Sequence, residues 1–290
     1  MDGYMNGLIN LFSGRPIKVA VAQTCIWHNR TEKNIELALQ MMREVSHEST
    51  DLICLPAAFA TGLNFPSLKR DAQTIDGPIM QTLQREAAAL SVTVVAGILE
   101  RDGDDIFDTA VYIDEQGKLL GKYRRNSIWE GESEYISRGN PAEVIETPHG
   151  RIGLLVGYDI RFPEACRGYF AQDVDMIVCV ANLFSKFGFS VETLCRARAA
   201  ENSCYFVLAN CLGENGFAML EYMGRSLVVD GNLMEVEQDR ERDVLARGNL
   251  RESVIRADIF VRRKKKVAGE LPYKADFLRI WNSSISCGRE

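Results

Sequence analysis

The chain has 290 residues, of which 46% are hydrophobic and 26% are charged, a composition that excludes a disordered or fibrous protein. Its 34 Lys and Arg residues against 40 Asp and Glu residues give a net charge of −6. Nucleic-acid-binding domains are usually strongly basic, so we expect no nucleic-acid partner.

Eight cysteines are a high number for a chain of this composition. Several lie inside apolar runs, such as Cys179 in the run 177–180, and we interpret them as reduced, buried thiols. This predicts a reducing compartment, the cytosol, and it makes a thiol nucleophile the first functional hypothesis. No run approaches the roughly 20 apolar residues of a membrane helix, so we expect no membrane partner.

The first half of the chain alternates strand and helix patterns. We expect strands at residues 17–24, 51–55 and 93–99, helices at 31–45 and 79–90, and a hairpin formed by 108–114 and 118–123.

The second half repeats this style. We expect strands at residues 151–157, 176–181, 205–210, 226–229 and 254–258, and helices at 164–171 and 193–202. Because strands alternate with helices and some strands form hairpins, the pattern predicts a layered α/β protein with a mixed sheet. No linker or solenoid repeat interrupts it, so one domain is expected.

Four local sequences are specific. Residues 51–62 read DLICLPAAFATG, 121–125 read GKYRR, 153–164 read GLLVGYDIRFPE and 196–202 read RARAAEN. In this order they closely resemble the carbon-nitrogen hydrolase family, the nitrilase superfamily. The resemblance covers roughly residues 17–277, which leaves 1–16 and 278–290 as tails. It implies a four-layer α-β-β-α sandwich with two mixed sheets, which usually forms a homodimer or a higher homo-oligomer.

The family resemblance also implies a Glu-Lys-Cys triad that hydrolyses nitriles, amides or carbamoyl groups. A thiolate attacks the carbon, a carboxylate moves protons, and an ammonium group stabilises the oxyanion. In this sequence the three positions hold Ala57, Arg125 and Gly157, although the residues that frame each position are present. The family's thiol mechanism is therefore not expected here, and whether the chain is an enzyme stays open.

A buried Arg125 needs a carboxylate in place of the missing glutamate. We expect it to pair with Glu132, where the family commonly carries a second glutamate, or to bind a small anionic ligand such as a carboxylate. The alternative is that Arg125 only fills the former pocket.

Other residues of the elbow and of the following strand are candidates for ligand contact. Tyr158 would offer a backbone N–H at the former oxyanion position, or would only cap the helix. Asn182 and Phe184 follow a buried strand where the family places pocket-lining residues. Asp159, Arg161 and Glu164 resemble the framework of the elbow.

No other cysteine is placed to take over the chemistry. Cys54 lies three strand residues before Ala57, roughly 10 Å away along the strand, and Cys166 lies on the helix after the elbow. His28, His47 and His149 lack metal-ligand spacing, so we expect no metal and no cofactor.

Three functions follow as hypotheses. The first is a non-hydrolytic pseudoenzyme, with a small-molecule-binding or regulatory role in or beside the vestigial pocket. The second is an enzyme with a re-purposed site, in which Arg125 and Glu132 promote condensation, cyclisation or elimination. The third is an assembly scaffold.

Overall fold

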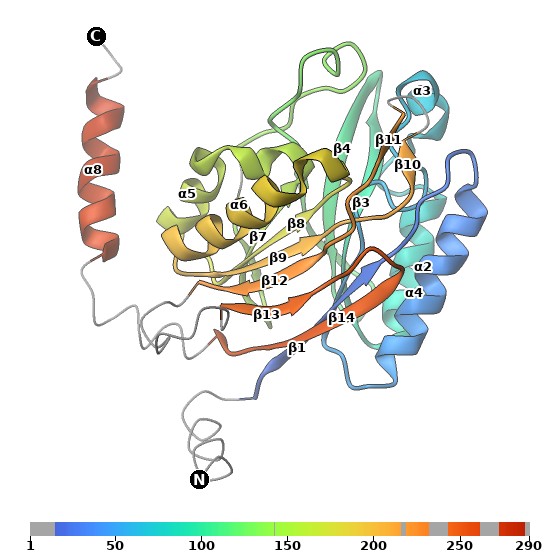
Figure 1. Cartoon of the computed structure of the whole chain (residues 1–290), viewed down its shortest axis with the longest axis horizontal. Coiled ribbons are helices and arrows are strands. Elements are labelled where there is room, and N and C mark those ends of the chain that lie inside the picture. Colours follow the sequence, from blue (N-terminus) through green and yellow to red (C-terminus); the bar gives the residue numbers. More distant parts are fainter. Residues whose placement is uncertain (1–14, 142, 216–218, 232–242, 262–272, 288–290) are drawn as a thin grey trace.

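Two six-stranded mixed sheets lie face to face, with helices covering the outer face of each (Figure 1). The computed structural model describes residues 15–141, 143–215, 219–231, 243–261 and 273–287, and the side chains of these except those of 187–189 and 282–287. The predicted residues 1–16 therefore lie mostly outside the described part. The layered α/β sandwich expected from the sequence is confirmed.

The first sheet has the strand order β14-β1-β2-β3-β4-β5, and helices α2 and α4 pack on its outer face. Its strands are β1 (Ile17–Gln23), β2 (Leu52–Cys54), β3 (Thr93–Asp102), β4 (Asp105–Ile113), β5 (Leu119–Arg124) and β14 (Ser253–Ile259). The helices of this half are α2 (Thr31–Ser46), α3 (Leu68–Asp71) and α4 (Pro78–Leu90), with a short 3-10 turn η1 (Phe65–Ser67). Helix α2 buries Ala38, Met41, Met42 and Val45, the spacing that places side chains on one helix face.

The second sheet has the order β13-β12-β9-β8-β7-β6. Its strands are β6 (Ile145–Thr147), β7 (Gly150–Val156), β8 (Met176–Val180), β9 (Tyr205–Ala209), β12 (Leu227–Asp230) and β13 (Val244–Arg247), with a separate ribbon of β10 (Glu214–Asn215) and β11 (Leu220–Glu221). The helices are α5 (Pro163–Ala171), α6 (Gly188–Glu201) and α8 (Tyr273–Cys287), with 3-10 turns η2 (Gly157–Arg161) and η3 (Ser185–Phe187).

Each sheet contains three parallel strands, β1-β2-β3 and β7-β8-β9. The continuations of β1 and β9 also run parallel, with the Ile26 N–H donating to Leu212 O at 3.0 Å and the Leu212 N–H donating to Thr24 O at 2.9 Å. The carboxyl ends of both sets of parallel strands therefore meet at one edge of the sandwich. Ligands of open α/β sheets bind at such an edge.

Several elements differ from the sequence expectation. Helix α6 begins at Gly188 and not at residue 193, although the Gly and Ser residues of its first turn have low helix propensity. The short strands β6, β10, β11 and β13 were not predicted. Helix α8 was not predicted either, and it crosses the expected domain limit at residue 277.

The first turns of α8 are fixed to α5 and to the end of α6. The Tyr273 hydroxyl donates a hydrogen bond of 2.7 Å to Glu201 O, and the Phe277 ring lies 5.0 Å from that of Phe170. The Arg167 guanidinium stacks 4.0 Å above the Phe277 ring and also donates to Glu201 O. This cation–π contact holds α8 against the second half of the molecule.

Candidate functional site

Gly157 forms the sharp turn between strand β7 and the 3-10 turn η2. Its φ of +44° lies in the left-handed region, which glycine adopts at little cost. A Cβ atom built on Gly157 would meet only Asn182 Oδ1, at 3.9 Å. The elbow therefore keeps room for a side chain that the sequence does not supply.

Ala57 lies after strand β2 and is completely buried. Its N–H donates to Ala181 O at 3.3 Å, so it sits beside the residue that precedes Asn182. A Cβ atom at Gly97 would lie 2.4 Å from the Ala57 Cα, so strand β3 approaches this loop closely only because residue 97 is glycine. Positions 57 and 157 thus converge on Asn182.

Arg125 follows strand β5 and points into the sandwich, with only 4% of its surface exposed. Its Nη2 lies 3.0 Å from Glu132 Oε2, so the structure contains the ion pair proposed from the sequence. Its Nε lies 3.5 Å from Asp108 Oδ2 on the neighbouring strand β4, a partner that sequence reasoning missed. The Arg125 N–H donates to Asp108 O at 2.9 Å, so hairpin pairing alone brings these two residues together.

Burial controls the electrostatics of this charge cluster, which we define as Asp108, Arg125, Glu132 and Asp159. Desolvation raises the pKa of Asp108 to about 6; the Arg125 cation opposes the shift, and the Glu132 and Asp159 charges add to it. Desolvation also raises the pKa of Asp159, despite hydrogen bonds from the Tyr123 hydroxyl and the Ser127 N–H.

The surroundings of Arg125 raise its pKa and so favour its charged form. Burial alone would lower the pKa of its guanidinium, but the charges of Asp108, Glu132 and Asp159 outweigh burial and raise it. Its Nε and Nη2 are nevertheless buried without a hydrogen bond, because their N–H groups are not directed at the two carboxylates. Asp108 Oδ1 has no partner either. The cluster sets one cation against three carboxylates, and its hydrogen bonds are incompletely satisfied.

The other three candidate residues occupy different surroundings. The Tyr158 ring stacks on Trp129 with centroids 5.9 Å apart and meets Phe162 edge-on at 5.2 Å. Asn182 keeps a buried Nδ2 without a partner. The Phe184 ring stacks on Tyr222, with ring centroids 5.5 Å apart. Their roles in ligand contact stay predictions.

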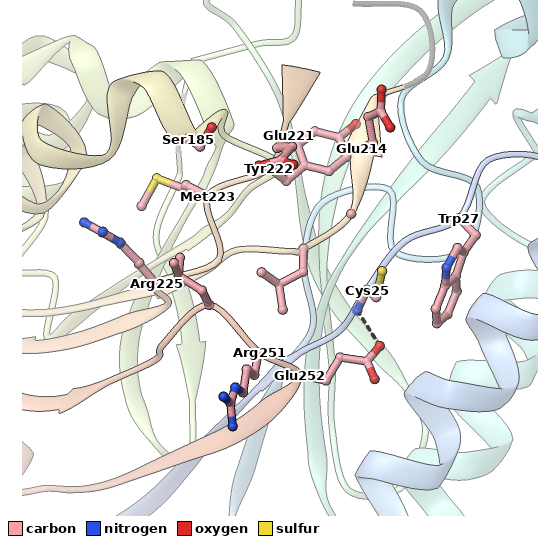
Figure 2. Close-up of a pocket in the computed structure, with 13 residues that line it drawn as sticks. Cys25, Trp27, Ser185, Glu214, Glu221, Tyr222, Met223, Arg225, Arg251 and Glu252 are labelled. Carbon is pink, nitrogen blue, oxygen red and sulfur yellow. Dashed lines mark hydrogen bonds between the residues drawn. The ribbon is translucent and has the colours of Figure 1, made fainter. Parts of the chain in front are cut away.

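A cavity of about 890 Å³ opens at the carboxyl edge beside these residues (Figure 2). Its walls come from the continuation of β1, from Ser185, from the segment after β9, and from residues 221–225 and 250–252. None of the five candidate ligand residues lines it, and Phe184 only backs its wall residue Tyr222. Sequence reasoning missed this cavity because its lining is contributed by five separate segments.

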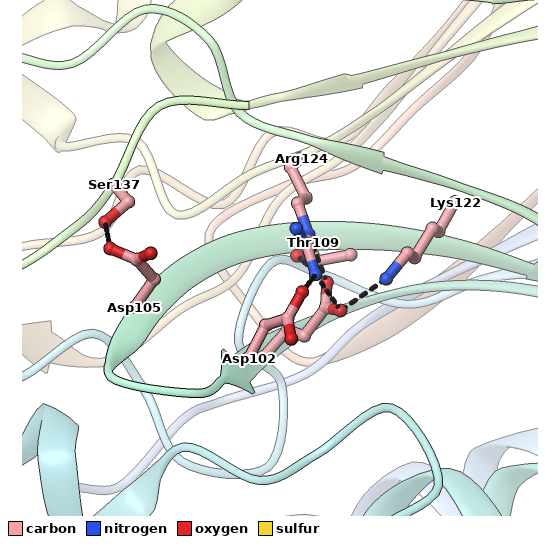
Figure 3. Close-up of polar contacts among 7 residues, drawn as sticks. Asp102, Asp105, Thr109, Lys122, Arg124 and Ser137 are labelled. Carbon is pink, nitrogen blue, oxygen red and sulfur yellow. Dashed lines mark hydrogen bonds and ion pairs between the residues drawn. The ribbon is translucent and has the colours of Figure 1, made fainter. Parts of the chain in front are cut away.

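Arg124 precedes Arg125 and points the other way, as alternate residues at a strand end do. Its guanidinium donates to both carboxylate oxygens of Glu100, at 2.6 and 3.0 Å, and to Asp102 (Figure 3). Lys122 and the Thr109 hydroxyl also donate to Glu100. This second network joins strands β3, β4 and β5, and it fixes the position of β5, the strand that Arg125 follows.

The described thiols are unsuited to nucleophilic attack. Cys54, Cys166, Cys179, Cys195 and Cys211 are buried and free of disulfides, and desolvation raises the pKa of each thiol. Burial also raises the pKa of the half-buried Cys25. Reactive cysteines have lowered pKa values, because the thiolate is the nucleophile.

No three His, Cys, Asp or Glu side chains within the described ranges are arranged to hold a metal ion. In the same part of the chain, no helix is both long and apolar enough to cross a membrane.

Comparisons with known proteins agree with the architecture. The chain is 28% identical to a nitrilase from Pyrococcus abyssi, over 87% of this chain and 93% of the relative, and 26% identical to the 2-oxoglutaramate amidase of Bacillus subtilis, over 88% and 95%. The crystal structure of XC1258 from Xanthomonas campestris, a CN-hydrolase superfamily protein, superimposes with a TM-score of 0.81 at 23% identity, covering 90% of this chain and 97% of that one.

Saccharomyces cerevisiae Nit3, a member of the nitrilase superfamily, superimposes with a TM-score of 0.79 at 24% identity, over 89% of this chain and 95% of that one. Both structural likenesses concern the fold. The family model for carbon-nitrogen hydrolases matches residues 18–245. By its sequence and by its two-sheet architecture, this chain belongs to the carbon-nitrogen hydrolase family.

Proposed function

We propose that this chain is a non-hydrolytic member of its family that binds a small molecule in or beside the vestigial site. One observation carries the proposal: a buried ion cluster stands where the family uses a lysine, beside an elbow whose residue has no side chain. The Arg125 guanidinium is shared between Glu132 and Asp108, and Gly157 offers no nucleophile.

The loss of thiol chemistry follows from the residue types. Without a side chain at Gly157 no thioester forms there, and Ala57 holds no proton to give or take. Removing the nucleophile of a catalytic triad typically lowers kcat by about 10⁴ to 10⁶, and removing its partners adds little. Arg125 is also a poor substitute for a lysine ammonium, because its planar guanidinium prefers forked anionic partners.

Small-molecule binding is supported by a buried polar group without a hydrogen-bond partner and by the room beside Gly157. Asn182 holds a buried, unpartnered Nδ2, and its Oδ1 borders the room left at Gly157. An unsatisfied buried donor typically costs about 1–3 kcal/mol, which a ligand acceptor would recover. An anionic ligand at Arg125 would have to replace Glu132, whose side chain is 13% exposed and so lies closer to solvent than the arginine.

One observation favours a second candidate, an enzyme with a re-purposed site. Burial raises the pKa of Asp108 to about 6, which is near the range useful for a general base. Perturbed carboxylates of this kind cluster at active sites, although structural ion networks produce them too. This candidate requires the Asp108 carboxylate to reach a substrate proton.

The experiment assays the purified chain against a panel of aliphatic nitriles and amides by ammonia release. We expect no turnover above buffer. The triple variant Ala57→Glu/Arg125→Lys/Gly157→Cys should gain a thiol that forms a hydroxylamine-sensitive thioester with an amide, because the elbow has room for it. Turnover by the unmodified chain that disappears in Asp108→Asn would overturn the proposal and favour the second candidate.

A further inference from the structure

The cavity of Figure 2 lies where the two sheets join. Cys25 and Trp27 follow strand β1, and Leu212 to Glu214 follow strand β9. The volume of about 890 Å³ is within the range of small-molecule sites. Its position outside the carboxyl ends of parallel strands is the position at which α/β sheets bind ligands.

Three buried amide side chains fix the walls of this cavity. The Gln23 Nε2 donates to Asn249 O at 2.7 Å and to Arg251 O at 2.9 Å, while its Oε1 accepts from the Ser226 N–H at 2.8 Å. The loop that carries Arg251 is therefore tied to strand β1 on one side and to the start of β12 on the other.

The remaining two amides hold the opposite wall. Asn210 Nδ2 donates to Gly224 O at 2.8 Å, and Asn215 Nδ2 donates to the Tyr222 hydroxyl at 3.0 Å. The Tyr222 ring is also stacked on Phe184, with an angle of 5° between the rings. A buried polar group costs free energy unless it is hydrogen-bonded. The hydrogen bonds of these three buried amides therefore indicate a pre-formed cavity and not a gap between loops.

The lining carries charges of both signs without internal pairing. Glu214 and Glu221 are directly opposed in the β10–β11 ribbon, an arrangement that is unfavourable for like charges. Arg225 and Arg251 also line the cavity. Among the described residues no ion pair joins Glu214 or Glu221 to either arginine, and Figure 2 shows these two glutamates on one side and Arg251 on the other. The third lining glutamate, Glu252, follows Arg251 and accepts a hydrogen bond from the Cys25 N–H.

We propose that this cavity binds a small amphoteric molecule, one that carries an ammonium group and a carboxylate group separated by an apolar segment. The ammonium group lies between Glu214 and Glu221 and relieves their repulsion, and the carboxylate pairs with Arg225 or Arg251. The apolar segment lies against Leu212, Met223 and the exposed Leu250. The inference rests on the proposed binding function and gives it a place and a ligand class.

The test uses 6-aminohexanoate as the probe, with hexylamine and hexanoate as one-charge controls of the same chain length, in calorimetric titrations of the full chain. We expect the probe to bind at least tenfold more tightly than either control. Equal affinity for the probe and a control, or no detectable binding of the probe, would overturn the inference.

Variants then locate the binding. Glu214→Gln/Glu221→Gln and Arg225→Gln/Arg251→Gln should each weaken probe binding at least tenfold, and all four side chains are exposed, so the fold is retained. Glu115→Gln and Lys118→Gln each remove one charge, negative and positive respectively, in the β4–β5 turn and should leave affinity unchanged. Retained affinity in both cavity variants overturns the inference.

Two results separate this inference from the proposed function. If Glu132→Gln changes the affinity for the probe at least tenfold while the cavity variants bind normally, the ligand lies at the charge cluster, so the inference is wrong and the binding function stands. If the same preparation releases ammonia from the amide panel, the proposed non-hydrolytic function is wrong whatever the titrations give.

Discussion

The guanidinium of Arg125 lies 3.0 Å from the carboxylate of Glu132, seven residues later in the chain, and both side chains are largely withdrawn from water. The same guanidinium lies 3.5 Å from Asp108. One cation thus faces two carboxylates inside the sandwich. Because a buried charge is tolerated only with compensation, each member of this cluster depends on the others.

Replacement of Arg125 by methionine is expected to destabilise the chain by about 3–5 kcal/mol, because it leaves buried carboxylates without their cation. Urea unfolding at pH 7 measures this loss. Arg125→Lys keeps the charge and should cost less. The triple variant Arg125→Met/Asp108→Asn/Glu132→Gln should recover much of the stability, because two of the three carboxylates of the cluster then carry no charge. A single Arg125→Met variant as stable as the parent would contradict the role of the cluster.

The contribution of Asp108 to the stability of the chain should fall as pH rises from about 4 to about 6. The unfolded Asp108 ionises near its ordinary pKa of 3.8, whereas burial keeps the native carboxyl protonated up to a pKa of about 6. In this window the native state binds more protons, so raising the pH favours unfolding, by at most about 3 kcal/mol. Asp108→Asn should flatten this decline, as measured by urea unfolding at a series of pH values. Parallel curves for the two proteins would refute this assignment. Because the pKa of Asp159 is also raised, part of the dependence of stability on pH should remain in both the parent and Asp108→Asn.

The alternation of strands and helices predicted the two-sheet architecture, since buried strands and one-sided helices are set by local periodicity. The pairing of Arg125 with Glu132 was also within reach of the sequence, because a buried arginine requires a nearby carboxylate. Asp108 was missed, although the hairpin register that places Thr109 opposite Arg124 signals its position beside Arg125.

The cavity and helix α8 could not be predicted from the sequence, for different reasons. The cavity walls are set by long-range contacts, such as those of Gln23 with residues more than 200 positions away, which no local pattern encodes. Helix α8 carries mixed polar residues after a basic stretch, and its first turns are fixed by tertiary contacts with Arg167 and Phe170. Tertiary packing of this kind routinely outweighs intrinsic propensity.

Gly157→Ala is expected to cost about 1–2 kcal/mol, because the φ of +44° is unfavourable for a residue with a Cβ atom even though the space is open. Gly168 is the matched control. It lies inside helix α5, and a Cβ atom there would also meet nothing within 4 Å, so Gly168→Ala should stabilise by about 0.5–1 kcal/mol. Thermal or urea unfolding of both variants gives the comparison. A gain at position 157 would show that the elbow is not held in this conformation.

Arg167→Gln should loosen helix α8 without disturbing the sheets. The substitution removes the stacking on Phe277 and the hydrogen bond to Glu201 O. Hydrogen exchange is expected to accelerate at least tenfold over residues 273–281, since local opening is set by the contacts that a segment makes. Lys274→Gln removes only the ion pair with Asp173, in which both side chains are over a third exposed, and should change exchange little. Equal hydrogen-exchange protection of residues 273–281 in the parent and in Arg167→Gln would show that Arg167 does not hold helix α8 in place.

Glu100→Gln should destabilise the sheet that carries Arg125. Burial alone would raise the pKa of Glu100, but the hydrogen bonds from Arg124, Lys122 and Thr109 outweigh it and lower the pKa. The stabilisation is therefore present above the unfolded pKa near 4.5 and is lost as pH falls through the lower native value. We expect a loss of about 1–3 kcal/mol at pH 7, below that of a fully buried pair because Arg124 and Lys122 are partly hydrated.

The loss caused by Glu100→Gln should shrink as the pH falls below about 4.5, because the parent carboxylate then also loses its charge. Asp102→Asn is the matched control: it pairs with the same Arg124 at 2.7 Å, but its side chain is 64% exposed, so less than about 1 kcal/mol is expected. Urea unfolding at pH 7 and pH 3.5 measures both variants. A Glu100→Gln variant whose deficit is the same at both pH values would show that packing, and not the carboxylate charge, accounts for its contribution to joining β3, β4 and β5.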